Sequence, residues 1–183
     1  MDWHDIIRRK KQIKYFEKEK IDSSVIREIF DEFHEHCPSK QNMTPYTITV
    51  IPNKGNKELK TQIFYDTWCN SEDSNDVRNT QVLAPYTLLF KGVGSNKMLS
   101  HIEIGIASTF IAYAAVNRGL EISFCACYKN DNADLILSIG HRSTTKTYFN
   151  PLLNREVPQL DWEDNGRDTG HVKKPLDEYV IWK

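Results

Sequence analysis

The sequence of 183 residues lacks an excess of charge of either sign and lacks a long uninterrupted apolar run. Lys and Arg total 24 and Asp and Glu total 25, which gives a formal net charge of -1 at pH 7. For the chain as a whole, this balance excludes the strongly basic composition of many nucleic-acid-binding proteins. The longest apolar stretch, Ile102 to Val116, is interrupted by Glu103, and a membrane-spanning helix needs roughly 20 apolar residues. We therefore expect no membrane partner and no nucleic-acid partner.

Signs of secretion and of a disulfide framework are also missing. Residues 2–5 contain two aspartates where a secretory signal peptide would carry positive charge, so we expect a cytoplasmic protein with reduced thiols. None of the four cysteines forms a C-x-x-C pair. Cys125-Ala126-Cys127 lies in an expected strand, where alternation would place both thiols on one face. We favour buried structural thiols over a metal site, because a metal needs further ligands that the sequence does not obviously supply.

The short motifs of several enzyme classes are absent. The sequence contains no G-x-G-x-x-G or Walker loop, no H-E-x-x-H and no G-x-S-x-G, so nothing in it supports a nucleotide-binding loop, a zinc protease or a hydrolase triad. With 39% hydrophobic and 27% charged residues, the composition is that of an ordinary globular protein. The length and the lack of linkers or repeats predict a single domain over residues 1–183.

What is present is positive charge crowded near the N-terminus, where Arg8-Arg9-Lys10-Lys11 is uninterrupted. Glu17 and Glu19 dilute this patch, and a second basic element, residues 171–174, precedes Pro175. Two basic clusters from opposite ends of a chain could neutralise one phosphate. A basic arm for a polyanion and a simple solvated helix end are the alternatives that the residues leave open.

Hydrophobic periodicity predicts interleaved helices and strands, which favours a layered α+β domain. We expect helices over residues 2–10, 23–37, 56–68 and 100–118, the second capped by Ser23 or Ser24 and the third burying Leu59, Ile63, Phe64 and Thr67. The last helix is apolar on nearly all sides, so we expect it to be buried. We expect strands over residues 46–51, 86–91, 121–128 and 135–139, the second of them central in the sheet. The tail from residue 141 reads as mostly irregular, with a further strand conceivable at residues 180–182.

Six segments, in order, resemble the FMN-dependent nitroreductase family. Residues 10–16 (KKQIKYF) are similar to its R-R-S-x-R-x-F opening, and residues 38–46 (PSKQNMTPY) to its P-S-x-x-N-x-Q-P-W loop. The other segments are Ala84-Pro85 with the following strand, the helix of residues 104–120, residues 136–140 (ILSIG) and residues 173–180 (KKPLDEYV). Each segment alone is weakly specific, but together they extend over almost the whole chain.

The resemblance implies a three-layer α+β fold with a central, mostly antiparallel sheet flanked by helices, assembled as an intertwined homodimer with FMN at the interface. It implies an oxidoreductase that passes a hydride from NADH or NADPH through flavin to a small electron-poor acceptor, such as a nitroaromatic or a quinone. No catalytic side chain is required. The residues that it implies for FMN binding are Lys10, Lys11, Gln12, Lys14, Pro38, Ser39, Lys40, Asn42, Ala126, Cys127, His171 and Lys173. A divergent flavin protein of the same fold, with a specialised or lost activity, is the first alternative, and a polyanion-binding module is the second.

Overall fold

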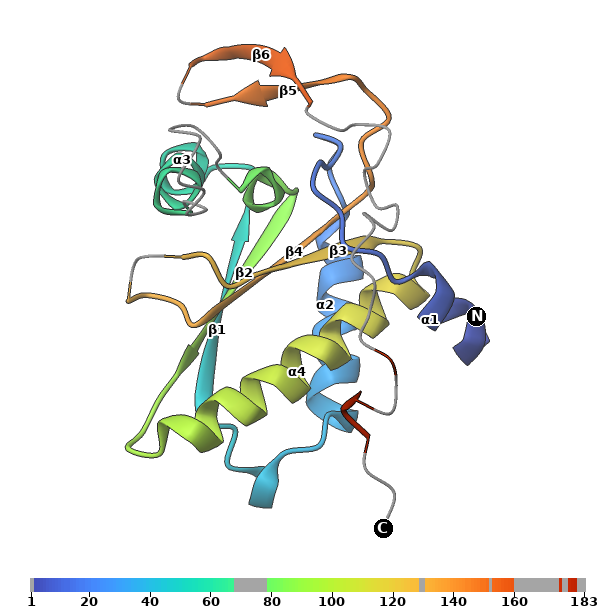
Figure 1. The fold of residues 1–183 in the computed structure, drawn as a ribbon, viewed down its shortest axis with the longest axis vertical. Helices are drawn as coiled ribbons and strands as arrows, with labels where there is room; N and C mark the ends of the chain where they lie inside the picture. The colour runs from blue at the N-terminus through green and yellow to red at the C-terminus, as the bar shows by residue number, and fades with distance from the viewer. Residues whose placement is uncertain are drawn as a thin grey trace.

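A computed structural model of the chain describes residues 2–67, 79–128, 131–151, 153–159, 175 and 178–180. Helices cover both faces of an antiparallel sheet, which gives the three expected layers (Figure 1). The helices are α1 (Trp3–Arg9), α2 (Ser23–His36), η1 (Lys40–Asn42), α3 (Lys57–Asp66), η2 (Thr80–Leu83) and α4 (Lys97–Asn117). The strands are β1 (Tyr46–Pro52), β2 (Tyr86–Gly92), β3 (Glu121–Cys125), β4 (Leu135–Gly140), β5 (Thr147–Asn150) and β6 (Arg155–Pro158).

The main sheet has the strand order β1-β2-β4-β3, and every neighbouring pair is antiparallel. The central position expected for β2 is confirmed, because it pairs with β1 on one side and with β4 on the other. Successive β2 side chains enter different cores: Leu88 and Phe90 pack with α2 and α4, whereas Leu89 packs with α3 and η2. Burial on both faces explains why this strand is almost continuously apolar.

One detail of each of the expected helices α2 and α3 is wrong. Asp22, rather than Ser23 or Ser24, caps α2, because its carboxylate accepts a hydrogen bond from the Ser24 backbone N–H at 2.9 Å. In α3, Leu59 is exposed and Lys60 is buried. The Lys60 ammonium donates to the Ala84 carbonyl at 2.9 Å and also contacts the Val82 carbonyl and the Thr87 hydroxyl. These acceptors satisfy the buried amine, whose pKa is lowered well below its usual value by burial. Apolar periodicity alone does not indicate this arrangement.

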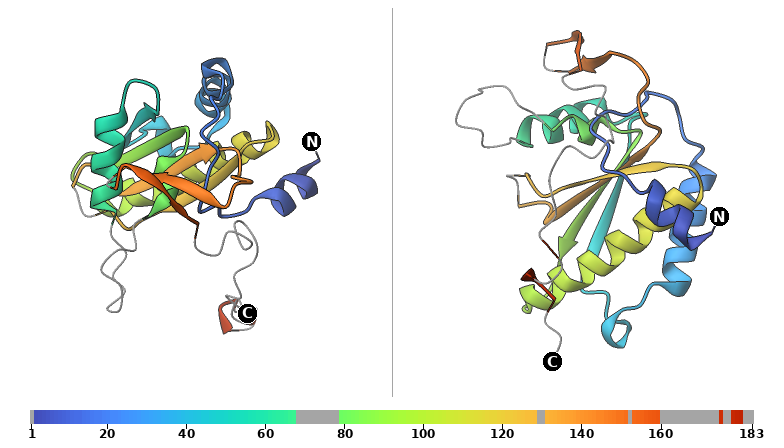
Figure 2. Two further views of the ribbon diagram at one scale, coloured as in Figure 1. Left: turned by 90° about the horizontal axis from the view of Figure 1, so that it is seen from above. Right: turned by 45° about the vertical axis from the view of Figure 1, so that its right-hand side comes forward.

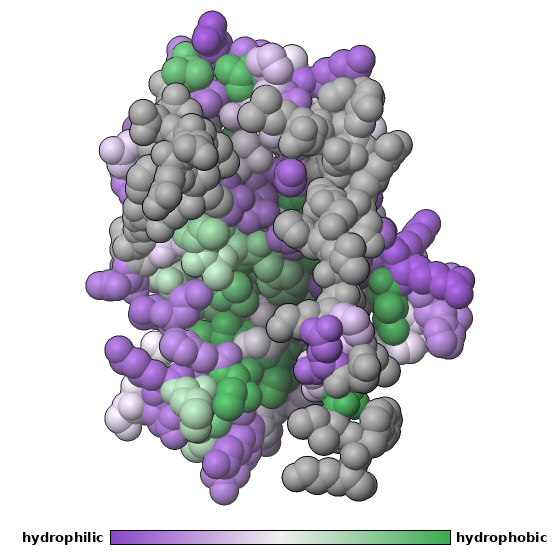
Figure 3. Space-filling view, in the orientation of Figure 1, coloured by the Kyte–Doolittle hydropathy of each residue, from purple (hydrophilic) through white to green (hydrophobic). Residues whose placement is uncertain are grey.

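Helix α4 is longer than expected and is not buried on all sides. It has 21 residues, and by length and composition alone it could cross a membrane. More than half of its most apolar stretch is nevertheless buried inside the fold, where Ile104, Ala107 and Ile111 pack against α2 and the sheet. Met98, Ile102 and Ile106 lie on its opposite, exposed face. Figure 3 shows apolar surface gathered on the side of the molecule where Figure 1 places α4.

The N-terminal segment and a hairpin in the tail also pack around the main sheet. The chain between α1 and α2 runs along the outer edge of β3, where Gln12 forms a parallel bridge with Ile122 and the Ile13 N–H donates to the Ile122 carbonyl at 3.1 Å. β5 and β6 form an antiparallel hairpin in the tail that was expected to be irregular. Figure 2 shows this hairpin lying across the end of the sheet.

Candidate functional site

The end of β3 gathers several of the residues predicted to bind FMN. Gln12 pairs with the backbone of Phe124 through both halves of its amide: Nε2 donates to the Phe124 carbonyl at 2.6 Å, and Oε1 accepts from the Phe124 N–H at 3.0 Å. The Lys10 Nζ lies 5.2 Å from the centre of the Phe124 ring, within the range of a cation–π interaction. Ala126 and Cys127, both exposed, follow directly after this strand.

The segment before β2 contributes polar groups that the sequence interpretation mostly missed. The Gln81 side chain donates to the Phe124 carbonyl at 3.1 Å and accepts from the Ser123 hydroxyl. The Thr80 hydroxyl donates to the Lys14 carbonyl at 2.8 Å. The polar run Asn79, Thr80 and Gln81, just before the Ala84-Pro85 motif, is the signal in the sequence that could have indicated these groups. The structure thus joins η2, β3 and the N-terminal segment in one hydrogen-bonded cluster.

The two cysteines at this end of β3 have different environments. Because β3 ends at Cys125, the expected alternation stops there: Cys125 is buried, whereas Cys127 is exposed, so the prediction of a shared face is wrong. Burial raises the pKa of Cys125, whose sulfur accepts from the Asn79 side-chain amide at 2.8 Å. Within the described part of the chain, no three His, Cys, Asp or Glu residues are grouped so as to hold a metal ion.

The loop of residues 38–45 is held in a fixed, partly strained conformation. The Ser39 hydroxyl accepts from the Thr44 N–H at 3.1 Å, and Glu103 Oε1 of α4 accepts from the Lys40 N–H at 2.8 Å. Gln41, Asn42 and Thr44 have φ values of 54°, 54° and 37°, in the left-handed region that residues other than glycine adopt at an energetic cost. The side chains of Lys40 and Asn42 are exposed, as is Pro38.

Glu103 gives this loop a negative electrostatic environment. Its side chain is only 3% exposed, and its second oxygen, Oε2, is buried without a hydrogen-bond partner among the described residues. Burial and then the Glu103 charge raise the pKa of Cys37. Burial, followed by Cys37 and Glu103, raises the pKa of Tyr46 to about 12.

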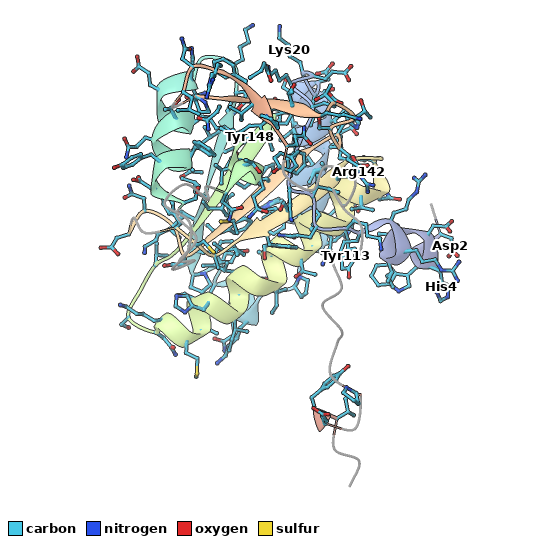
Figure 4. The ribbon with its side chains drawn as sticks, turned by 45° about the horizontal axis from the view of Figure 1, so that its top comes forward. Asp2, His4, Lys20, Tyr113, Arg142 and Tyr148 are labelled. Atoms are coloured by element: carbon cyan, nitrogen blue, oxygen red, sulfur yellow. The ribbon has the colours of Figure 1, made fainter. Side chains whose placement is uncertain are left out.

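Within a single copy of the chain, the loop of residues 38–45 and the end of β3 lie at different places. The loop is anchored at Glu103, whereas α1, which leads into residues 10–14, packs Trp3 against Tyr113 with ring centres 5.2 Å apart. Ten helical residues between these two anchor points correspond to roughly 15 Å along α4. Figure 1 shows the loop that follows α2 lying away from β3, and Tyr113 is labelled in Figure 4. His171 and Lys173, predicted to bind phosphate, lie outside the described residues.

Lys11 faces a different part of the surface from Gln12. It lines a cavity of about 340 Å³ together with Arg8, Arg9 and Arg142, beside Glu121 and the end of α4. Arg142 is labelled in Figure 4, near α1. The basic run therefore divides between this cavity and the cluster at the β3 end.

Comparison with known proteins identifies the fold. No family model and no curated protein matches the sequence. Among solved structures, the FMN- and NADPH-dependent nitroreductase NfnB from sphigopyxis sp. strain HMH aligns over 100% of this chain and 99% of its own, with a TM-score of 0.70 and 13% identity. A nitroreductase family protein from Clostridium novyi NT aligns over 78% of this chain and 87% of its own, with a TM-score of 0.63 and 24% identity. The FMN-bound nitroreductase from Bacteroides fragilis NCTC 9343 aligns over 78% and 90%, with a TM-score of 0.61 and 13% identity. The arrangement of helices around the antiparallel sheet is therefore the nitroreductase fold.

Proposed function

We propose that this protein is an FMN-dependent oxidoreductase that passes a hydride from NADH or NADPH, by way of the flavin, to an electron-poor acceptor such as a nitroaromatic or a quinone. The observation that carries the proposal is the fold, shared over essentially the whole chain with an FMN- and NADPH-dependent nitroreductase. We propose that it acts as a single cytoplasmic domain of residues 1–183, with no membrane or nucleic-acid partner.

The groups at the β3 end fit a flavin by their chemistry. Lys10 and Lys14 bring positive charge to this region, Ala126 and Cys127 present exposed chain directly after the strand, and Asn79 is held nearby through Cys125. Cations close to a flavin stabilise its anionic reduced form and its phosphate. Bound FMN would supply the hydride chemistry, while the protein supplies binding, orientation and charge.

Gln12 takes a positioning role in this proposal. Both halves of its side-chain amide are engaged by the Phe124 backbone, so it fixes the N-terminal segment against β3. This pairing sets where Lys10 and Lys14 stand relative to the chain that follows β3. We retain Ser39, Lys40 and Asn42 as contacts to the ribityl chain and ring, and His171 and Lys173 as contacts to the phosphate.

The separation of the loop from the β3 end favours a homodimer. A site made from residues 38–42 and residues 10–14 draws the loop from a second copy, because within one copy the loop is anchored at Glu103 of α4 whereas residues 10–14 contact β3 and η2. The exposed apolar face of α4 provides a surface on which such a partner could pack. We therefore propose that FMN lies at the interface between two copies.

Cofactor content of the purified protein tests the proposal. We expect a yellow protein whose flavin absorbance bleaches when NADPH or NADH is added without oxygen. Charge reversal in the double variant Lys10→Glu, Lys14→Glu should weaken FMN binding by tenfold or more, about 1.4 kcal/mol. Lys54→Glu, an exposed lysine in the turn after β1, is the matched control and should retain FMN. Protein that stays colourless and cannot be reconstituted with FMN would overturn the proposal.

A bound flavin that is not reduced by either nicotinamide would favour the divergent flavin protein. The basic cavity of Arg8, Arg9, Lys11 and Arg142 favours polyanion binding as a separate alternative. Retention on heparin that is lost with salt, in protein that takes up no flavin, would identify that function.

A further inference from the structure

A second cavity, separate from the end of β3, lies beneath the β5–β6 hairpin. Its volume is about 310 Å³, at the lower end of the range of small-molecule sites. It opens between α3, η2, the hairpin and the chain that follows Lys14. Its walls are Tyr15, Phe16, Lys18, Asn53, Lys57, Lys60, Thr61, Thr80, Leu83, Tyr148, Phe149 and Pro151. Figure 4 labels Tyr148, which contributes one of the aromatic walls.

Aromatic side chains form the wall on the hairpin side. The rings of Tyr15 and Tyr148 are 5.5 Å apart and tilted, and Phe149 follows on the same strand. The hairpin is held in place by Gln159, whose side chain donates to the Thr147 carbonyl and to the Ser143 hydroxyl, each at 3.0 Å. The Ser143 N–H in turn donates to the Tyr15 carbonyl at 3.0 Å, which ties the chain before the hairpin to the segment that carries Tyr15.

The charge of the walls is entirely positive. Three lysines line the cavity, and none of its described walls carries a carboxylate. The Lys18 and Lys57 ammonium groups lie 5.3 and 5.9 Å from the centre of the Phe149 ring, so both stand beside the same aromatic ring. Lys18 is also paired with Glu156 at the surface. This leaves Lys57, exposed at the start of α3, as the cation best placed to meet an anion.

Lys60 has a structural role in the same cavity. Its ammonium points to the Val82 and Ala84 carbonyls and to the Thr87 hydroxyl. These hydrogen bonds tie α3 to η2, and burial lowers the pKa of Lys60 well below its usual value. Lys60 is therefore not the cation that this cavity offers to a ligand.

We propose that this cavity binds a small aromatic carboxylate, with the ring against Tyr15, Tyr148 and Phe149 and the carboxylate beside Lys57. The aromatic walls favour a ligand with a flat ring, because such a ring can stack and be buried there. The lysines, with no carboxylate among the described walls, favour a ligand that carries one negative charge. Because charge-assisted hydrogen bonds are stronger than neutral ones, the acid should bind more tightly than its uncharged analogue. This cavity shares Thr80 with the cluster at the β3 end, but the inference does not rest on flavin binding.

Binding of 2-naphthoate and of its neutral amide, measured by calorimetry on the purified full chain, tests this inference. We expect the acid to bind about tenfold more tightly than the amide. Lys57→Gln should reduce the affinity for the acid to that for the amide and leave the amide unchanged. Lys54→Gln, three residues earlier and absent from the cavity wall, is the matched control and should bind both as the wild type does.

Two further measurements keep the result specific to this cavity. Tyr148→Ser should weaken the binding of the acid and of the amide alike, because it removes a ring contact without changing the charge of the cavity. The variant Lys10→Glu, Lys14→Glu should still bind 2-naphthoate, whereas loss of binding there, or displacement of the acid by FMN, would place the acid in the flavin site. Equal affinities for acid and amide, no binding at millimolar concentration, or no effect of Lys57→Gln would overturn the inference.

Discussion

Three ionisable side chains lie close together beside the loop of residues 38–45: Cys37, Tyr46 and Glu103. One carboxylate oxygen of Glu103 accepts a hydrogen bond from the Lys40 N–H. The other is buried and has no hydrogen-bond partner among the described residues. The raised pKa values of Cys37 and Tyr46 follow first from burial and then from neighbouring negative charge. A carboxylate that orders a strained loop therefore makes deprotonation of its neighbours unfavourable.

This arrangement predicts a loss of stability at high pH. The unfolded chain releases the Tyr46 proton near pH 10, whereas the folded chain holds it to about pH 12. Between these values the folded state binds more protons, so the free energy of unfolding should fall as pH rises. The slope from this group should stay below ~1.4 kcal/mol per pH unit, because partial exposure screens the interaction.

Urea unfolding of the wild type and of Tyr46→Phe at pH 9, 10 and 11 measures this effect. Phenylalanine keeps the ring and removes the titrating hydroxyl, so its stability should depend less on pH in this window. Parallel pH profiles for the two proteins would contradict the assignment.

At the scale of elements, α4 presents two faces with different roles. One face packs Ile104, Ala107 and Ile111 into the larger core, while Met98, Ile102 and Ile106 remain exposed at 72%, 53% and 38%. An exposed apolar row on a helix whose opposite face is buried is typical of a surface that a partner covers. This is the element on which the proposed homodimer depends.

Acidic substitutions on this face should separate the copies. In the double variant Ile102→Glu, Ile106→Glu, like charges would meet across the interface. We expect the dissociation constant of the dimer to rise about 100-fold or more. Light scattering on a sizing column would measure the mass of each protein. Leu59→Glu introduces one such charge at an exposed apolar position of α3 and should leave the mass unchanged. A wild type that runs as a monomer would contradict the proposed dimer.

Sequence periodicity predicted the main elements well and the hairpin not at all. Strand β2 was recognisable because both of its faces are buried, which makes its sequence continuously apolar. β5 and β6 have four residues each, and most of their side chains are exposed or half-buried, so they lack the alternation that marks a strand. Burial of Lys60 escaped prediction because it depends on acceptors more than 20 positions away along the chain.

The candidate site was predictable only as far as sequence order allowed. Motif order indicated Lys10, Gln12 and the chain after β3, and the structure brings these residues together. The pairing of Gln12 with Phe124, 112 positions away, depends on tertiary contact, which no local pattern encodes. Thr80 and Gln81 escaped notice for the same reason.

For the molecule as a whole, Gly140 marks the point where three distant segments meet. A methyl group added there would lie 2.6 Å from Pro85 Cδ and 2.7 Å from Phe16 Cδ1. The backbone of β4 therefore approaches the start of β2 and the N-terminal segment more closely than any side chain permits. This contact holds the N-terminal segment, at Phe16, against the end of β4.

Gly140→Ala should destabilise the protein by about 1–3 kcal/mol, as expected when a well-packed site is overfilled. Thermal and denaturant unfolding would measure the loss. The same substitution should cost less in a Phe16→Ala background, because the ring that it meets is gone. Equal costs in both backgrounds would mean that Phe16 does not restrict this position.

The pairing of the N-terminal segment with β3 also has a consequence for aggregation. β3 is an outer strand of the sheet, and an uncovered strand edge can recruit strands from other molecules. Ile13 bonds to Ile122, and the Gln12 side chain substitutes for a further peptide group by bonding both backbone groups of Phe124. The N-terminal segment therefore covers this strand edge and prevents it from pairing with another molecule. A chain shortened past Phe16 would expose an apolar strand prone to joining another copy, whatever its effect on the flavin.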